Sequence, residues 1–313
     1  MKNIMHVLIP IAAGTISFGV AVGVAADVQS AASSAPRSAP TSAVSAPVEH
    51  QRNTTQQEGD RAVDQDAVAA LAEAQKAVRA IGTGKREQAL AAIERATGKI
   101  AVLTARKPSA ALIPVKSEVA IIDLAPKDRA AIEALTGAAR DALSKSDYPT
   151  ARAFLDHLAS EIHVKKYNLP LATYPAAMQT AARLLDEKMD EAAKQTLLTA
   201  LNTLVITDTA IPLPLVEVQA SIKEAQMKQD QDKPGARALL GAAKQQLDRA
   251  QDLGYAYRAP EYASLSESIS ELDRRLGGTQ NTTSAFASLK DKMTAFFERI
   301  AHQETPRQAP AKG

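Results

Sequence analysis

Residues 168–175 read Asn-Leu-Pro-Leu-Ala-Thr-Tyr-Pro, and a shorter apolar block with two prolines, Ile-Pro-Leu-Pro-Leu, follows at 211–215. Each block comes after a run of residues with strand-like character and before a stretch with helical spacing. Proline cannot donate a backbone hydrogen bond to a strand ladder, and its fixed φ suits the first turn of a helix. We therefore expect each block to end a strand and to begin a helix.

The segments 113–124, 161–167 and 204–211 are rich in β-branched residues, and the last two alternate in polarity. β-Branched residues favour strands, and alternation is the pattern of a half-buried strand. Each segment connects two stretches with helical spacing. We expect at least two of these segments to pair as short antiparallel strands, in a small sheet at one end of a helical bundle.

The rest of the chain is dominated by apolar residues at helical spacing, interrupted by glycine and proline turns. Pro126 is predicted to lie in the first turn of one helix, and Asp147 is predicted to be the N-cap of the next. The fold class expected is mainly α, an irregular bundle of antiparallel helical hairpins with a small two- or three-stranded β element. The predicted helices cover about 63–81, 85–105, 126–145, 149–162, 175–187, 190–203, 215–228, 234–253, 260–276 and 286–300.

The two ends of the chain differ in composition from this helical domain, which we place at residues 60–302. Residues 1–26 have a basic start, an apolar run and small residues before Asp27, as in a secretory signal peptide. The run is also long enough to span a bilayer if it is not cleaved. Residues 27–59 are low in complexity and are expected to be a disordered Ser/Ala/Pro-rich spacer, and residues 303–313 a disordered tail.

The composition excludes several classes of site. The chain has no cysteine, so it has no disulfide, no thiolate metal site and no cysteine nucleophile. The formal net charge is +2 and both signs are interspersed, which does not favour nucleic-acid binding. Gly82-Thr83-Gly84-Lys85 is too short for a phosphate-binding loop and is explained as a turn that ends a helix.

His157 and His163 lie in the interior of the helical domain, and the other histidines lie at the ends of the chain or in the spacer. His157 and His163 are six residues apart, a spacing that does not place two metal ligands on one helical face. Partly exposed histidines are therefore the favoured interpretation. One alternative stays open, in which these histidines, Asp156 and Glu161 titrate together as a pH sensor. We predict no catalytic residue, no cofactor-binding residue, no metal ligand and no cofactor.

Two apolar features each have two interpretations. The last helix carries an apolar stripe, which either packs on the bundle or joins subunits and captures apolar segments of unfolding clients. Its residues are Phe286, Leu289, Met293, Phe296, Phe297 and Ile300. Tyr167 and Tyr174 either pack in the core, which is the default for such residues, or line a groove for small apolar ligands.

Several blocks in order resemble the YfdX family of bacterial exported proteins, over roughly residues 63–300. The resemblance implies a mostly helical soluble protein of the periplasm, associated with acid and drug stress, and it brings no catalytic residues to carry over. The blocks are 167–175, 181–186, 200–209, 211–215 and 250–255.

These observations predict a non-enzymatic periplasmic stress-response protein that acts through protein contacts or self-association, chaperone-like under acid stress. The alternative is a periplasmic module that binds small apolar or cationic compounds, including drugs. We expect no nucleic-acid partner, and membrane contact only through an uncleaved signal.

Overall fold

Three long antiparallel strands lie at the centre of the computed structural model, which describes residues 45–256, 259–301 and 305–306. The strands are β1 (Leu112–Asp123), β2 (Ser160–Pro170) and β3 (Val205–Pro212), in the spatial order β1-β2-β3. Residues 207–208 of β3 also pair with a two-residue strand, β4 (Thr305–Pro306). The three segments predicted to be strands are therefore confirmed.

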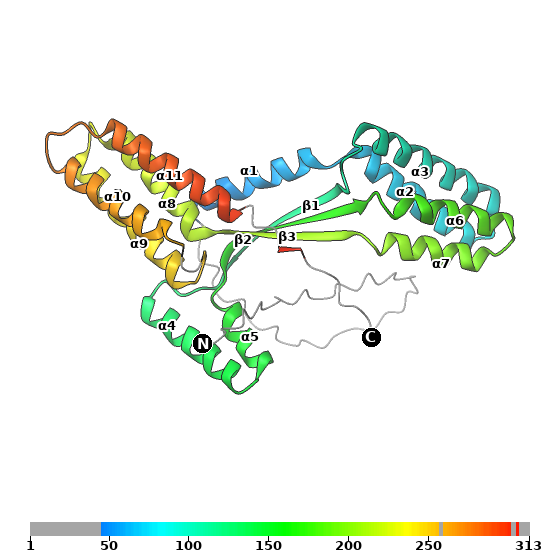
Figure 1. Cartoon of the computed structure of the whole chain (residues 1–313), viewed down its shortest axis with the longest axis horizontal. Helices are drawn as coiled ribbons and strands as arrows, with labels where there is room; N and C mark the ends of the chain where they lie inside the picture. Colours follow the sequence, from blue (N-terminus) through cyan, green and yellow to red (C-terminus); the bar gives the residue numbers. More distant parts are fainter. Residues whose placement is uncertain (1–44, 257–258, 302–304, 307–313) are drawn as a thin grey trace, which may run out of the picture.

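Helices lie at both ends of these strands rather than at one end (Figure 1). One group consists of α2 (Gln65–Gly82), α3 (Arg86–Arg106), α6 (Tyr174–Asp186) and α7 (Asp190–Leu201). The other consists of α8 (Leu213–Lys228), α9 (Lys233–Asp252), α10 (Glu261–Leu276) and α11 (Thr283–Ala301). The hairpin of α4 (Arg129–Ser144) and α5 (Tyr148–Asp156) belongs to neither group, and α4 contacts α9 of the second (Figure 1).

The predicted position of the sheet, at one end of a single bundle, is therefore wrong, although the mainly α class of helical hairpins with a small sheet is confirmed. The reason is strand length. β1 has 12 residues, and a strand of that length spans roughly 40 Å at about 3.3 Å per residue. Hairpins attached to opposite ends of such strands are too far apart to share one core.

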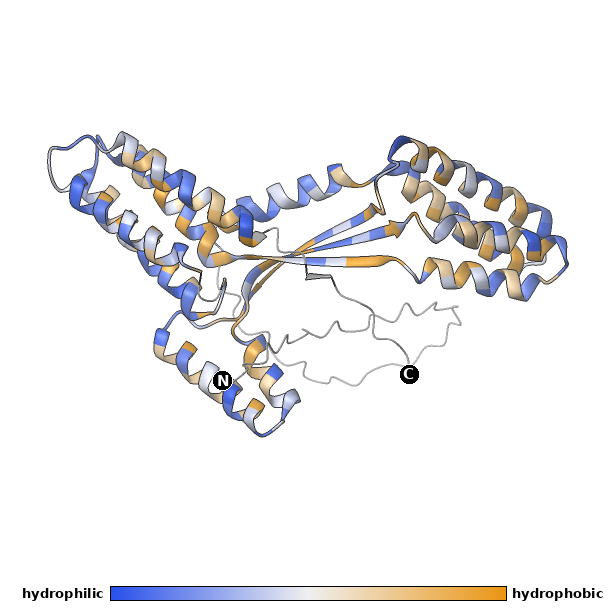
Figure 2. Ribbon diagram, in the orientation of Figure 1, coloured by the Kyte–Doolittle hydropathy of each residue, from blue (hydrophilic) through white to orange (hydrophobic). Residues whose placement is uncertain are grey.

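Each helical group has its own core, seen as apolar stripes turned inward in Figure 2. In the first group, α2 and α3 approach through small residues, because alanines occupy most of their buried positions. In the second, leucines of α10 pack against the apolar stripe of α11, and leucines of α9 belong to the same core. A third, smaller cluster joins Ile162, Val164 and Ile211 of the sheet to Leu213 and Val216 of α8.

The proline blocks form the junctions that the sequence predicts. Pro170 is the last residue of β2, and Pro175 lies in the first turn of α6. Pro212 is both the last residue of β3 and the N-cap of α8, and Pro214 lies in the first turn of that helix. The strand therefore passes directly into the helix at the second block.

Two helix ends differ from the expected ones. Helix α4 begins after Asp128, whose side chain accepts a hydrogen bond from the backbone N–H of Ala131 at 3.0 Å, so Pro126 lies outside the helix. Helix α5 ends at Asp156, and Ile162 belongs to β2 rather than to the helix. Asp147 is the N-cap of α5, as predicted, and accepts from the N–H of Thr150 at 3.2 Å.

Part of the predicted spacer is a helix, α1 (Ala46–Ala62). It lies alongside β1 between the two helical groups (Figure 1) and buries only Val48, Thr55 and Gly59. The prediction of disorder is thus wrong from residue 46 onward, because tertiary contacts stabilise a helix whose composition alone does not. Residues 27–44 and the predicted signal lie outside the described residues, as does the predicted tail except for the two residues of β4.

The junction between α1 and α2 is fixed by Asp64. Its backbone N–H donates to the carbonyl of Pro114 at 2.9 Å, and its carboxylate caps α2 at the N–H groups of Asp66 and Ala67. Lys107 Nζ lies 2.8 Å from the same carboxylate and lowers the pKa of Asp64. The junction therefore loses stability as the pH falls and Asp64 becomes protonated.

We expect Asp64→Ala to lower the free energy of unfolding by about 1–2 kcal/mol, because the α2 N-cap loses its acceptor. Urea unfolding at neutral pH measures this loss. Asp156→Ala is the matched control, since that exposed carboxylate at the end of α5 caps no helix; it should change stability by less than about 0.5 kcal/mol. An equal loss in both variants would contradict the capping role.

Candidate functional site: the His163 cluster on the sheet

Three titratable side chains meet on one face of the central sheet. Glu161 and His163 are two residues apart on β2, so both project from the same face. Asp208 is opposite Lys165 in the β2–β3 register, which places it diagonally beside His163. The Nε2 atom of His163 lies 2.6 Å from Glu161 Oε1, and its Nδ1 lies 3.2 Å from Asp208 Oδ1.

This cluster is shielded from solvent. The side chains of His163, Glu161 and Asp208 are only 12%, 8% and 9% exposed. Hydrogen bonds to Asp208 and Glu161 outweigh the cost of burying the charge and raise the pKa of His163 to about 9. At neutral pH the imidazole is therefore a cation held between two carboxylates, with both ring N–H groups donating.

A protonated imidazole of this kind cannot act as a general base at neutral pH. The geometry favours a structural ion cluster that joins β2 to β3. Within the described residues, no group of three or more His, Asp or Glu side chains is arranged to hold a metal ion. The His163 imidazole can bind and release a proton, and its release removes the positive charge between the two carboxylates.

A second set of polar contacts joins Ser160, next to Glu161 on β2, to the turn that follows α9. The Tyr255 hydroxyl accepts from the backbone N–H of Ser160 at 2.8 Å, and Ser160 Oγ donates to Asp123 Oδ1 at 2.7 Å. Burial, followed by the nearby charge of Glu161, raises the pKa of Tyr255. Gly254 makes this contact possible, since its φ of +86° turns the chain back after α9.

The same region fixes the start of the α4–α5 hairpin. Arg249 of α9 donates to the carbonyls of Ala125 and Pro126 at 3.1 and 3.3 Å. It also lies 3.7 Å from Asp123. One polar network therefore connects the ends of β1 and β2 to the second helical group.

Only part of the four-residue pH-sensing group suggested by the sequence comes together. Glu161 and His163 are in contact, whereas Asp156 and His157 lie at the end of α5. His157 is exposed, and its Nδ1 lies 2.7 Å from the carbonyl of Ala153 in its own helix. Asp208 completes the cluster and was not predicted from the sequence. The sequence predicts that the two strands pair, but only the register of that pairing places Asp208 beside His163.

The family model described as YfdX protein matches residues 70–210, from α2 to the end of β3. Over this part the chain is similar to the YfdX family. The resemblance seen in the sequence is thereby confirmed, and the matched segment includes Glu161, His163 and Asp208. Two of the blocks that carried the resemblance, 211–215 and 250–255, lie beyond the matched YfdX residues.

A solved crystal structure of Salmonella Typhi YfdX is similar to 48% of this chain and 93% of that chain, with 13% sequence identity and a TM-score of 0.34. No curated protein matches the chain.

The two tyrosines of the YfdX segment do not line a common groove. Tyr174 is fully buried in the core of the first helical group, which is the default expected from the sequence. Tyr167 lies on the same sheet face as His163, and its hydroxyl donates to Glu118 at 2.9 Å. The buried Tyr174 hydroxyl has no hydrogen-bond partner, and burial raises its pKa.

We expect Tyr174→Phe to raise the free energy of unfolding by about 1 kcal/mol, because it removes a buried hydroxyl that makes no hydrogen bond. Tyr262→Phe is the matched control, since the equally buried Tyr262 hydroxyl donates to the carbonyl of Tyr255 at 2.6 Å. That variant should lose about 1 kcal/mol. Urea unfolding measures the free energy of unfolding of both variants. A lower free energy of unfolding for Tyr174→Phe would contradict the prediction.

The apolar stripe of α11, outside the YfdX match, packs on the bundle. Phe286, Leu289, Met293, Phe296 and Ile300 are buried against α8 and α10, and Phe296 contacts the ring of Tyr262 edge-on with centroids 5.1 Å apart. Phe297 is partly buried toward the sheet. Core packing, one of the two interpretations of this helix, is therefore the role these side chains fill.

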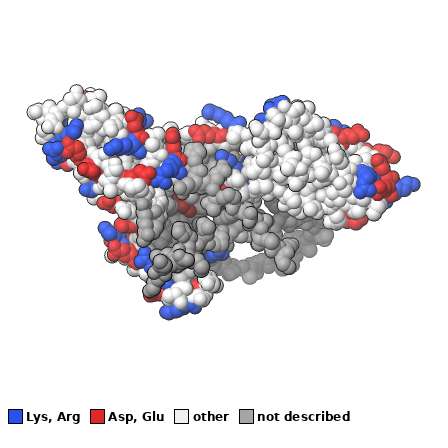
Figure 3. Space-filling model, viewed as in Figure 1, with Lys and Arg blue, Asp and Glu red and all other residues white. Residues whose placement is uncertain are grey.

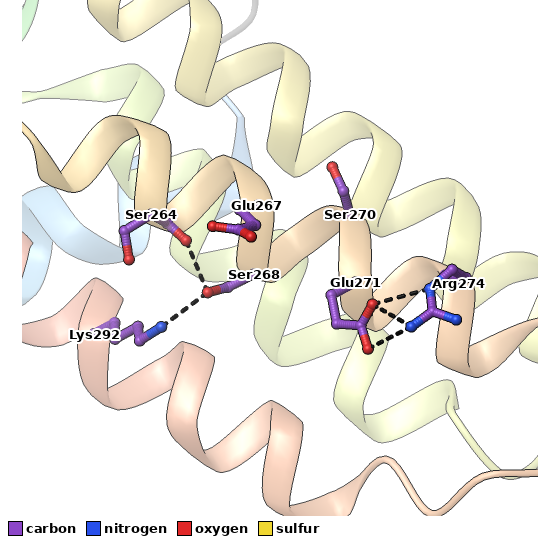
Figure 4. Close-up of a pocket in the computed structure, with 7 residues that line it drawn as sticks. All are labelled: Ser264, Glu267, Ser268, Ser270, Glu271, Arg274 and Lys292. Atoms are coloured by element: carbon purple, nitrogen blue, oxygen red, sulfur yellow. Dashed lines mark hydrogen bonds and ion pairs between the residues drawn. The ribbon is translucent and has the colours of Figure 1, made fainter.

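Two hollows in the described surface offer little for an apolar ligand. The larger, of about 480 Å³, lies on the outer side of α10 and α11, and polar side chains line it (Figure 4). These side chains bond one another, as Lys292 does with Ser268 at 3.0 Å and Arg274 with Glu271 at 2.8 Å. The other, between α8 and α11, has about 190 Å³. Ligand sites are usually enclosed and mostly apolar.

Positive and negative side chains are mixed on the face shown in Figure 3, and neither sign gathers into a broad patch there. Among the helices that the structure describes, none has the length and apolar character needed to cross a bilayer.

Proposed function

We propose that this chain is a non-catalytic stress protein of the bacterial periplasm that acts through protein contacts, and that it captures apolar segments of other proteins at low pH. The observation that carries the proposal is the apolar face of the central sheet. Ile162, Val164 and Ile211 form this face, with Val119 and Ile121 of β1 beside them.

Helix α1 is one part of the cover over this face, together with Leu213 and Val216 of α8 and Phe297 of α11. Helix α1 places Val48 against the sheet, but the helix as a whole buries only three residues. Displacing α1 uncovers the part of this face that Val48 covers, where apolar segments of unfolding clients could bind, and it leaves the cores of both helical groups intact. A covered apolar surface that can be uncovered suits a protein that binds clients only under stress.

Acid weakens the attachment of α1 at the end where it joins α2. At its start α1 is held by the Ser45 hydroxyl, which donates to the Glu217 carboxylate of α8 at 3.2 Å. At the other end, the lowered pKa of Asp64 means that its contribution is present above pH 3.8 and is lost as the pH falls further. The proposal therefore places client binding in acid.

Light scattering from an aggregating client protein, at neutral pH and at about pH 3, tests this proposal. We expect the purified protein to suppress aggregation in acid and to have little effect at neutral pH. Gly59→Ala, which loosens α1, should extend the protection to neutral pH, whereas Gly98→Ala on α3 should not. Unchanged client aggregation in acid with equimolar protein would refute the chaperone-like function.

The alternative, a module for small apolar or cationic compounds, has less support in the geometry. Both hollows described above are open, and the larger one is lined by polar side chains that pair with one another. We therefore propose the protein-contact function rather than the binding of small compounds.

A further inference from the structure

The outer edge of β1 is protected in four ways. Within the described residues β1 pairs only with β2, so no strand covers its other edge. Pro114 and a register shift between Pro114 and Lys116 interrupt this edge, Lys116 adds a charge, and α1 lies along it. Natural proteins use these same devices to keep sheet edges from pairing with other chains.

Helix α1 contacts the edge through one amide side chain. Gln56 Oε1 accepts from the backbone N–H of Val119 at 3.1 Å, and Gln56 Nε2 donates to the carbonyl of Ser117 at 3.5 Å. One turn further along, Gly59 approaches so closely that a Cβ there would lie 2.2 Å from Ser117 Oγ. Gln56 thus occupies the bonding positions that a neighbouring strand would take.

The sequence of β1 is nearly symmetric about Ser117. Residues 113–121 read Ile-Pro-Val-Lys-Ser-Glu-Val-Ala-Ile. If two β1 strands pair antiparallel about this serine, each Lys116 faces Glu118 of the second copy and each Val115 faces Val119. Opposite charges directly across a strand pair stabilise it, and a twofold interface contains each such pair twice.

We propose that the β1 edge is a self-association surface for a second copy of this chain, which α1 covers and whose pairing is centred on Ser117. The two copies then form one continuous sheet. The register shift beside Pro114 limits the contact to about residues 115–119 of each copy. The proposal does not depend on client binding, so its test is separate from the aggregation assay.

Cross-linking tests the register. The chain has no cysteine, so Ser117→Cys and Val119→Cys each introduce a single thiol, both in a Gly59→Ala background that loosens α1. Directly paired residues have Cα atoms about 4.5–5.5 Å apart, within reach of a disulfide. The two copies of residue 119 are offset by roughly 13 Å along the strands. We expect several-fold more covalent dimer from Ser117→Cys, and equal yields would overturn the register.

Charge reversal tests the partner. In the same Gly59→Ala background, Lys116→Glu places like charges across both pairs and should weaken the dimer roughly tenfold. The double change Lys116→Glu with Glu118→Lys restores both pairs and should restore the affinity. Sedimentation across a concentration series measures the mass. A dimer insensitive to the reversal would overturn the proposal, as would a monomer whose α1 amides exchange freely.

Gln56→Ala provides a second way to loosen α1, because it leaves the close approach at Gly59 unchanged and serves if Gly59→Ala does not fold. We expect it to dimerise more readily than the unchanged protein, with the same response to the charge reversals. A Gln56→Ala protein whose α1 amides exchange freely but whose mass stays monomeric would count against the edge as the association surface.

Discussion

Replacing His163 by glutamine should lower the free energy of unfolding at pH 7 by roughly 2–3 kcal/mol. The variant removes the cation and leaves Glu161 and Asp208 close together at exposures of 8% and 9%. Two nearby buried carboxylates without their cation carry a large penalty. A pKa that rises from 6.5 to about 9 on folding corresponds to an effect of this size, reduced somewhat by the solvent that still reaches the cluster.

The pH dependence gives this prediction its sign. The pKa of His163 is higher in the folded protein, so its contribution is complete below pH 6.5 and is lost as the pH rises through about 9. The difference in unfolding free energy between the protein and His163→Gln should therefore shrink over this range. His157→Gln is the control, because that exposed ring contacts only a carbonyl of its own helix.

Urea unfolding at several pH values between 6.5 and 9.5 measures both variants. A difference for His163→Gln that stays constant across the range would contradict the raised pKa. A comparable loss for His157→Gln would show that the effect does not arise from the ion cluster. Because mild acid does not change the charge of His163, the acid response that we propose rests on carboxylates such as Asp64 rather than on this histidine.

The sequence predicts local structure well where each residue's conformation depends on its neighbours in the chain. Asp147 caps α5 and Pro175 begins α6, because caps and fixed φ angles act over a single turn. The strands were identified for the same reason, from β-branched residues. By contrast, the separation of the two helical groups follows from strand length together with pairing register, and no short pattern encodes it.

For a related reason, the sequence predicts only two of the three residues of the candidate site. Glu161 and His163 stand two residues apart, so alternation alone places them together. Asp208 joins them across 45 positions of sequence through the β2–β3 register. Asp156 and His157 are also near Glu161 in the sequence. They lie at the end of α5, however, before the chain enters β2, and so they do not join the cluster.

Helix α1 was missed because its stability depends on contacts far away in the sequence. Residues 46–62 are mostly polar, and such composition in isolation favours disorder. What holds the helix are Gln56 at the edge of β1 and the close approach of Gly59 to Ser117. Glycine is a poor helix residue, so its presence in the last turn marks a packing contact rather than a helix signal.

That packing contact leads to the second large effect, on Gly59→Ala. The added Cβ would lie 2.2 Å from Ser117 Oγ and 2.7 Å from its Cβ, so α1 and β1 have to separate. Overpacking of this kind typically costs about 1–3 kcal/mol, against a gain in helix propensity of about 1 kcal/mol. We expect a net loss, expressed as faster amide exchange along α1 and at Val119.

Gly98→Ala and Gly241→Ala isolate the cause, because a Cβ at either helical position meets no atom within 4 Å. Both should gain about 0.5–1 kcal/mol from helix propensity alone. Opposite signs for the same chemical change would establish that Gly59 is selected by its contact with Ser117. A stabilised Gly59→Ala with slow α1 exchange would instead mean that the helix shifts without leaving β1, and the edge would then stay closed to a second copy.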